Sequence, residues 1–288
     1  MGDDPATWGS AVPEGWTVRR FATIDSTNRW LLDEARGGAP AGLVAVADHQ
    51  DAGRGRRGRP WEDEPGAALL VSVLLRPDLR PDRVHLVAMA AGVAIAEAVE
   101  ATCGVIASLK WPNDLVVDDR KLAGLLAEVD VARAGEPPVV VVGIGCNVTQ
   151  TSFPAALAAT ATSCALEAAR SARPPVVTRD DLLDAFLDRL RDRLGALADV
   201  PGAYRDRLGT LGRSVRVDLG ESILEGTATD VDDDGRLVVE PVGGGPEVTV
   251  AVGDVVHLRH HGPGESGSAA PGSGGPGDPG SSDPELGV

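Results

Sequence analysis

Lysine is almost absent from this 288-residue chain, in which only Lys110 and Lys121 stand among 27 basic residues. Both lysines lie inside one short stretch, KWPNDLVVDDRKLAG. Arginine serves at the other basic positions, whereas a compact, rotatable ammonium is what a reacting carboxylate or phosphate needs from a point charge. The clustering therefore indicates a site, with chance in an arginine-rich composition as the alternative.

Cysteine is scarce too, and the chain shows no sign of export. Cys103, Cys146 and Cys164 are odd in number, lack C-x-x-C spacing and sit in apolar surroundings, which excludes a disulfide framework or a zinc site. The first fifteen residues have no basic and apolar signal pattern, and no uncharged apolar run is long enough to span a bilayer. We therefore expect reduced core cysteines in a cytoplasmic protein.

Positive charge is in deficit, because the formal net charge is −16. Nucleic acids and anionic membranes both require a broad basic face, so neither is an expected partner. A chain of this length with 43% hydrophobic residues can bury a sizeable core in one or two domains.

The positive charge that is present gathers in one loop, QDAGRGRRGRPW, at residues 50–61. Its arginines alternate with glycines, namely Arg54, Arg56, Arg57 and Arg59 with Gly53, Gly55 and Gly58. Glycine lets backbone N–H groups approach an anion closely, so the pattern predicts an anion-binding loop. The glycines also match the dinucleotide fingerprint, but prolines follow where that site needs a helix, and we reject the match.

Five motifs follow one another along the chain. They are DSTN (25–28), GRGRRGRPW (53–61), KWPND (110–114), RKLAG (120–124) and GIGCNV (143–148). Taken together, they closely resemble the biotin protein ligase family over roughly residues 17 to 260. The resemblance implies an enzyme that joins biotin to ATP as biotinyl-5′-AMP. Biotin then passes to a lysine of the biotin carboxyl carrier domain of a biotin-dependent carboxylase.

The resemblance also implies an α+β fold, in which a mixed β-sheet catalytic domain of the biotin/lipoate ligase type precedes a small SH3-like β-barrel. We assign residues 1–16 to an N-terminal extension, 17–205 to the catalytic domain and 211–260 to the C-terminal SH3-like domain. Residues 262–288 are mostly Gly, Ser and Pro, which predicts a disordered tail. Sixteen residues are too few for a DNA-binding domain, so the resemblance is to the monofunctional class.

Hydrophobic periodicity and turn signals predict the elements that carry the motifs. Strands are expected at 18–22, 67–75, 105–110, 115–117, 122–131 and 139–148, and helices at 25–35, 84–101 and 178–197. Four short strands follow at 214–219, 223–230, 237–240 and 248–252. Lys110 and Lys121 then flank a hairpin and can face one pocket.

Attack of a carboxylate on an α-phosphate brings two anions together, so fixed cations should supply most of the catalysis. The resemblance places Lys121 and Arg56 at the biotin carboxylate and the α-phosphate, as the catalytic pair. Arg54, Arg57 and Arg59 would gather the remaining phosphate charge.

For the uncharged ureido head of biotin, the resemblance implies Ser26, Thr27 and Gln50, whose hydroxyl and amide groups match its donors and acceptors. Asn28 is expected to support them. The other residues implied to contact biotin are Gly53, Arg54, Gly55, Arg56, Lys121 and Gly124. A plain helix N-cap remains the alternative for Ser26.

Trp61 is the implied platform for adenine, with Asn147 reading its edge, and a role as a core anchor remains the alternative for Trp61. Asn113 and Lys110 complete the ATP-binding set, although Lys110 could instead brace the hairpin. Asp114 is expected to contribute to a Mg²⁺ ion held mainly by ATP phosphates. Asn113 and Asp114 could equally form only the turn after Pro112.

Three other classes of protein share some of these features. A lipoate-type protein ligase shares the fold and the adenylation step, but the arginine loop, KWPND and the C-terminal domain favour biotin. An enzyme that forms lysyl-AMP needs K-x-D-G, which neither lysine begins. A ligand sensor would need an output domain, and only the small C-terminal domain is available.

Overall fold

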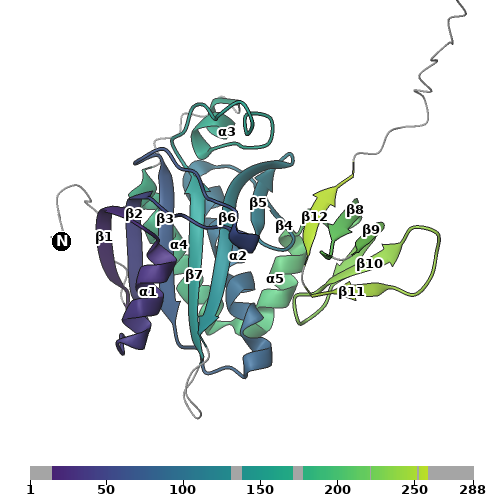
Figure 1. Cartoon of the computed structure of the whole chain (residues 1–288), viewed down its shortest axis with the longest axis horizontal. Coiled ribbons are helices and arrows are strands. Elements are labelled where there is room, and N and C mark those ends of the chain that lie inside the picture. The colour runs from purple at the N-terminus through teal and green to yellow at the C-terminus, as the bar shows by residue number, and fades with distance from the viewer. Residues whose placement is uncertain (1–14, 131–137, 171–177, 221, 252, 259–288) are drawn as a thin grey trace, which may run out of the picture. The chain divides into compact units, whose positions relative to one another are not determined.

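The computed structural model describes residues 15–130, 138–170, 178–220, 222–251 and 253–258. The predicted tail at 262–288 and nearly all of the predicted N-terminal extension lie outside the described residues. A seven-stranded mixed sheet with helices on both faces carries the motifs, and a five-stranded sheet follows it in the chain (Figure 1). The predicted α+β class is confirmed.

The large sheet has the strand order β1-β2-β3-β7-β6-β5-β4. Only β1 and β2 pair in parallel, and the other neighbours are antiparallel. Its strands are β1 Thr17–Ile24, β2 Leu43–Gln50, β3 Ala68–Leu75, β4 Ser108–Lys110, β5 Asp114–Val117, β6 Arg120–Asp130 and β7 Val139–Asn147. The central position of β3 and β7 explains their nearly continuous apolar sequences, because both faces are covered.

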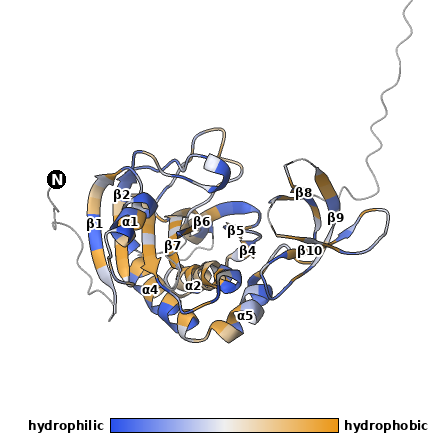
Figure 2. Cartoon of the chain, turned by 60° about the horizontal axis from the view of Figure 1, so that its bottom comes forward, coloured by the Kyte–Doolittle hydropathy of each residue, from blue (hydrophilic) through white to orange (hydrophobic). Residues whose placement is uncertain are grey.

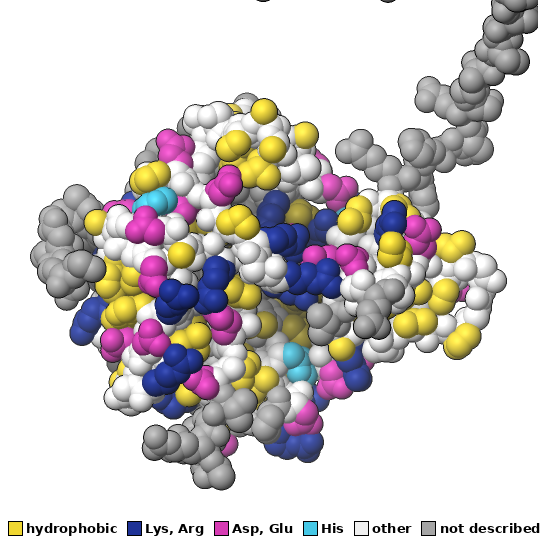
Figure 3. All heavy atoms as spheres, viewed as in Figure 1, with side chains coloured by type: hydrophobic (Ala, Val, Ile, Leu, Met, Phe, Trp, Pro, Cys, Tyr) yellow, Lys and Arg dark blue, Asp and Glu magenta, His cyan; other side chains and the backbone are white. Residues whose placement is uncertain are grey.

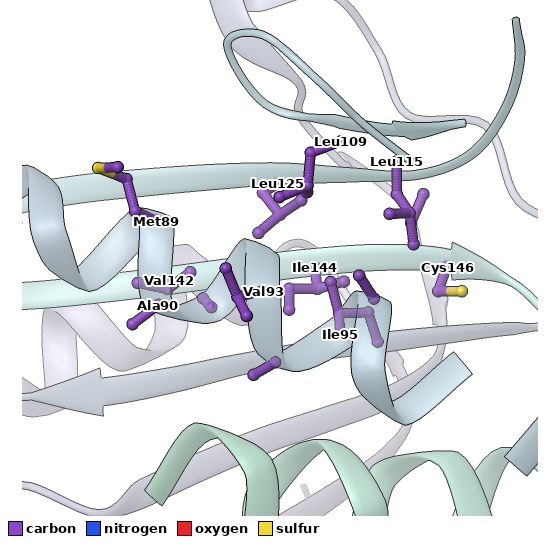
Figure 4. Packing of buried hydrophobic residues seen from close by; sticks show 14 of the residues in the cluster. Met89, Ala90, Val93, Ile95, Leu109, Leu115, Leu125, Val142, Ile144 and Cys146 are labelled. Atoms are coloured by element: carbon purple, nitrogen blue, oxygen red, sulfur yellow. The ribbon is translucent and has the colours of Figure 1, made fainter. Parts of the chain in front are cut away.

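One face of the large sheet is covered by α2 (His85–Cys103) and α4 (Arg179–Gly195), with α5 (Val200–Arg207) packed against α2. Apolar side chains of α2 such as Val93 lie against Ile144 of β7 (Figure 4). Figure 2 shows the apolar stretches of α2 and α4 beside the sheet. This layer forms the main core, and it explains why α2 is apolar on almost every side.

The opposite face is covered by α1 (Thr27–Arg36). Leu31 and Ala35 pack on Ala45, whereas its neighbours Val44 and Val46 belong to the main core. This alternation follows from the two-residue period of a strand. It leaves the N-terminus of α1, with the DSTN motif, above the middle of the sheet.

Helix α2 is the one helix of the described residues that is long and apolar enough to cross a membrane by length and composition. Within its most apolar window, 72% of the residues are buried inside the protein. The core helix of a water-soluble protein has the same properties, so the helix is weak support for a membrane span.

The C-terminal sheet is antiparallel and has the order β11-β10-β9-β8-β12. Its strands are β8 Ser214–Asp218, β9 Ile223–Val231, β10 Leu237–Pro241, β11 Val248–Val250 and β12 Asp254–His257. The predicted small β-domain is therefore present. Its described strand pairs run in a line from β11 to β12, and the sequence pattern did not predict β12.

The remaining elements are short. They are α3 Cys164–Arg170 and the 3₁₀ turns η1 Arg56–Gly58, η2 Pro81–Arg83 and η3 Leu197–Asp199. Neither α3 nor α5 was predicted, because each has too few residues to show a helical period. The three cysteines are free and buried, as predicted.

Candidate functional site

A cavity of about 150 Å³ lies where the N-terminus of α1, the arginine loop and strands β6 and β7 meet. Most residues selected from the sequence line it: Ser26, Thr27, Asn28, Gln50, Arg54, Gly55, Arg56, Arg59, Trp61, Asn113, Lys121 and Gly124. They come from segments that are far apart in the chain. Gly143, Ile144 and Gly145 of the GIGCNV motif also line it, so the fold brings all five motifs into one site.

The neutral polar end of the cavity is built on the first residues of α1. The Ser26 hydroxyl accepts a hydrogen bond from the Arg29 amide at 3.4 Å, so Ser26 caps the helix and lines the cavity at once. The Thr27 amide donates to Gln50 Oε1 at 2.9 Å. This bond fixes the orientation of the Gln50 carboxamide, whose NH₂ group remains a donor.

A chain of hydrogen bonds beneath this end fixes which groups accept. Asn28 Nδ2 donates to the Glu128 carboxylate at 2.7 Å, so Asn28 Oδ1 is left to accept from Ser72 at 2.6 Å. The Thr27 hydroxyl then has two acceptors within reach, Ser72 Oγ at 2.7 Å and Gln50 Oε1 at 3.0 Å. Because its proton goes to one of them, Thr27 offers a ligand only lone pairs.

Two glycines of the GIGCNV motif make room for side chains of the site. A Cβ atom on Gly143 would lie 2.2 Å from Asn28 Oδ1, and one on Gly145 would lie 2.5 Å from the Trp61 ring. Strand β7 therefore approaches both side chains more closely than any larger residue allows. Gly124 on β6 is similarly close to Trp61 and to Lys121.

The ammonium of Lys121 lies at the other end of the cavity. Its Nζ atom is 2.7 Å from Asp114 Oδ1 and 5.6 Å from the centre of the Trp61 ring. Leu115 pairs with Ala123 but Val116 pairs with Lys121, so Leu122 is the extra residue of a β-bulge. Bulges re-aim side chains beside functional sites, and this one stands next to Lys121.

The arginine loop folds back on itself. The Trp61 amide donates to the Gly53 carbonyl at 3.0 Å, and the Gly55 amide donates to the Arg59 carbonyl at 2.7 Å. Arg57 at the tip has φ +57° and Gly58 has φ +71°, both in the left-handed region. No α-helix opens within this loop, which agrees with the rejection of a dinucleotide site.

Carboxylates of the C-terminal sheet neutralise the loop. Asp254 on β12 lies 3.1 Å from Arg59, 3.5 Å from Arg57 and 3.9 Å from Arg56. Asp218 adds a second carboxylate 3.5 Å from Arg57. Figure 3 shows basic side chains gathered near the centre of the view with acidic ones beside them. Three guanidinium groups converging on one carboxylate form an arrangement that suits a phosphate.

Arg56 is the most deeply set of these cations. Burial lowers its pKa, and the neighbouring Asp254 opposes that effect. Its guanidinium also donates to the Gly253 carbonyl at 3.2 Å and to Asn113 Oδ1 at 3.4 Å. Arg56 therefore connects the arginine loop with both the KWPND motif and the start of β12.

Five residues selected from the sequence do not line the cavity. Gly53 packs beneath the Trp61 carbonyl, and Arg57 points to the C-terminal sheet. Lys110 and Asp114 are backbone partners across β4 and β5, and neither lines the cavity. Asn147 donates to the Thr162 carbonyl at 2.9 Å and faces Gln150, so its carboxamide is engaged within the protein. Its predicted contact with adenine stays a prediction.

The fit of a divalent cation depends on Asp114. Among the described residues no group of three or more His, Cys, Asp or Glu could hold a metal ion. Mg²⁺ that arrives on a nucleotide needs only one or two protein carboxylates. Asp114 is partly exposed beside Lys121, so the donor set fits a cation carried by ATP rather than a resident metal.

The sequence did not reveal Ser72, Gly143 or Gly145 as site residues. Ser72 is completely buried, and it is the one polar residue of an otherwise apolar strand. Because a buried hydroxyl needs partners, that isolated serine was a signal. The two glycines alternate along β7, which was a second signal for close approach by other groups.

One end of the cavity offers neutral hydrogen-bonding groups and the other offers cations near a carboxylate. This arrangement suits a ligase that activates a carboxylic acid with a neutral polar head. The model of the biotin/lipoate A/B protein ligase family matches residues 20–147, and that of the biotin protein ligase C-terminal domain matches residues 210–258. The chain belongs to the biotin protein ligase family.

Individual relatives agree with this assignment. The biotin–[acetyl-CoA-carboxylase] ligase of Mycobacterium tuberculosis is 40% identical over 253 residues, which cover 85% of this chain and 91% of the relative. The bifunctional ligase/repressor BirA of Bacillus spizizenii is 32% identical over 75% of this chain and 67% of its own length. The biotin protein ligase of Aquifex aeolicus, solved with biotin and ATP, superimposes with a TM-score of 0.70 at 26% identity, covering 84% of this chain and 99% of that one.

Proposed function

We propose that this protein activates biotin with ATP as biotinyl-5′-AMP and transfers it to a lysine of a biotin carboxyl carrier domain. The observation that carries the proposal is the polarity of one cavity. The lone pairs of Thr27 and the amide of Gln50 lie at one end, and Lys121 and Arg56 lie at the other. A cyclic urea presents N–H donors and a carbonyl acceptor side by side, which matches the first end.

In the first step the biotin carboxylate attacks the α-phosphate of ATP, and pyrophosphate leaves. Lys121 and Arg56 would hold the two anions together and stabilise the charge that develops at phosphorus. Arg54, Arg57 and Arg59 would receive the remaining phosphate charge. Mg²⁺ would neutralise part of the triphosphate, with Asp114 as its protein ligand.

In the second step the amine of the carrier lysine attacks the biotinyl carbonyl, the bond to the phosphate oxygen breaks, and AMP leaves. The carrier is proposed to be the biotin domain of a carboxylase. We further propose that the protein acts in the cytoplasm, where its three free cysteines would stay reduced.

Lipoate is the rival substrate, because the family model covers both kinds of ligase. Lipoate has no urea, so it would leave the free lone pairs of the buried Thr27 hydroxyl and the NH₂ group of the half-buried Gln50 without a ligand partner. A site built to hydrogen-bond a ligand discriminates strongly against an analogue that lacks those groups. The polarity of the cavity therefore favours biotin.

The test is the rate of pyrophosphate release from ATP with biotin, with lipoate and with neither acid. We expect pyrophosphate release from ATP when biotin is present, and none with lipoate or with neither acid. Thr27→Val is the matched variant, since it keeps the side-chain shape but removes the lone pairs, and it should raise the KM for biotin by about tenfold. Release with lipoate at a comparable rate would overturn the substrate assignment.

A further inference from the structure

Lys121 is held in place by a segment that none of the sequence motifs includes. Its amide donates to the Thr160 carbonyl at 2.7 Å, and its carbonyl accepts from the Thr162 amide at 2.9 Å. These two bonds pair Lys121 with Ala161 as in a parallel sheet. The pairing between β6 and β7 begins only at Ala123, so residues 160–162 supply the neighbour that β7 does not.

Thr162 is fixed in turn by its own side chain. Its residue is completely buried, and its hydroxyl donates to the carboxylate of Glu167 on α3. Arg170 donates to the same hydroxyl at 3.2 Å. A hydroxyl between a carboxylate acceptor and a guanidinium donor has both its proton and a lone pair engaged, so its orientation is determined.

Glu167 also reaches the hairpin that carries Lys121. Arg120, the residue before Lys121, donates to both Glu167 oxygens at 3.2 and 3.3 Å. The Glu167 side chain is only 7% exposed. One buried carboxylate therefore holds both sides of the pairing, through Arg120 on β6 and through Thr162 on the segment opposite.

We propose that Glu167 and Thr162 are positioning residues for Lys121. Neither residue lines the cavity, and they act by fixing the backbone from which the ammonium projects. Their contribution to catalysis is needed because Lys121 stands beside a β-bulge of the β5–β6 ladder and before Ala123, the first residue of β6 that pairs with β7. This inference rests on the proposed function, in which Lys121 stabilises adenylation.

Loss of this positioning should slow the adenylation step more than it weakens the binding of biotin. Thr27 and Gln50, at the ureido end of the cavity, lie on α1 and β2, whereas residues 160–167 bond to Lys121 and Arg120 of β6. Small misplacement of a catalytic group has a large effect on rate. Loss of the Thr162 hydroxyl should therefore reduce kcat while leaving the KM for biotin almost unchanged.

The experiment compares three variants of the full-length chain by pyrophosphate release with biotin and ATP. Thr162→Val removes the hydroxyl and keeps the shape, and we expect kcat to fall by about tenfold with the biotin KM within about twofold of wild type. Thr162→Ser restores the hydroxyl and should restore kcat. Thr249→Val makes the same change at an exposed position on β11, outside the segment that pairs with Lys121, and should have no effect.

Glu167→Gln is the second test, because it weakens the hold on Arg120 and on Thr162 together and should reproduce the kcat loss. Melting temperatures of all variants separate positioning from unfolding. The proposal is overturned if Thr162→Val matches Thr249→Val, if Thr162→Ser loses as much activity as Thr162→Val, or if kcat falls only with the folded fraction. An inactive wild type with biotin would instead refute the proposed function.

Discussion

The ammonium of Lys121, which lines the cavity together with Arg56, lies 2.7 Å from the carboxylate of Asp114. The pair satisfies the cation before any substrate binds. A substrate carboxylate or phosphate must therefore share Lys121 with Asp114, and Mg²⁺ on the nucleotide would give Asp114 another partner. This relationship connects two residues that the sequence assigned to separate roles.

Lys121→Ala should abolish adenylate formation, since it removes the point charge without removing core volume. Lys121→Arg should also fail, because a planar guanidinium cannot replace a compact ammonium at the same reach beside Trp61. Both variants are measured by pyrophosphate release with biotin and ATP. Near-normal release by the arginine variant would reduce Lys121 to a general source of charge.

Gly143→Ala should weaken biotin binding by about tenfold, because the new methyl group would displace Asn28 from Ser72 and Glu128. Titration calorimetry with biotin gives the dissociation constant. Gly195→Ala, at the exposed end of α4 with no atom near its Cβ, is the control. Equal affinities in the two variants would show that the Asn28 network does not shape the ligand site.

Asp254→Asn should loosen the arginine loop in the absence of ligand, because three guanidinium groups would lose their shared counter-charge. The measurement is the rate of tryptic cleavage between residues 54 and 59. We expect faster cleavage in the variant, and protection of both proteins by biotin with ATP. An unchanged rate without ligand would show that the C-terminal carboxylates do not hold the loop.

His257 should make stability depend on pH. Burial lowers its pKa, as do Lys110 and Arg213, and the hydrogen bond with Asp119 opposes them. A lowered pKa means that the folded state binds fewer protons, so this stability is present above the unfolded pKa of about 6.5 and is lost as pH falls through the folded value. Between about pH 7 and 5.5 the melting temperature should fall more in wild type than in His257→Gln. Parallel pH profiles of melting temperature for wild type and His257→Gln would contradict this. His85→Gln is the control variant, and its profile should follow that of wild type.

Arg56→Gly should still form the adenylate, more slowly, but release it early. Arg56 ties the loop to Asn113 and to the Gly253 carbonyl, so its loss both removes charge and opens the loop. Free biotinyl-AMP would then label lysines of a bystander protein, which a blot detects at equal enzyme and ATP. If the variant forms adenylate but labels the bystander no more than wild type does, Arg56 does not retain the intermediate.

Most residues chosen from the motifs line one cavity because each motif is a local sequence pattern with a local physical cause. The arginine loop gathers charge and glycine within a few residues, and Ser26 marks the start of a helix. Strand and helix positions followed from periodicity, with most ends displaced by only a few residues. The strand expected at 105–110 is shorter, at Ser108–Lys110, and the helix expected at 178–197 ends at Gly195.

What the sequence could not show depends on contacts between distant segments. Ser72 is 45 residues from Thr27, and its role exists only because β3 passes beneath α1. The pairing of Lys121 with Ala161 and the approach of Asp254 to the arginine loop are likewise tertiary contacts. Short elements such as β12 and α3 have too few residues for any period to appear.

The cavity is proposed to activate biotin for transfer to a carrier lysine. The most direct measurement is the intact mass of a biotin carboxyl carrier domain after incubation with the protein, ATP, Mg²⁺ and either biotin or lipoate. We predict the addition of a single biotinyl group, dependent on ATP and lost when the target lysine is replaced by arginine. Modification by lipoate at a comparable rate, or no modification by biotin, would contradict the claim.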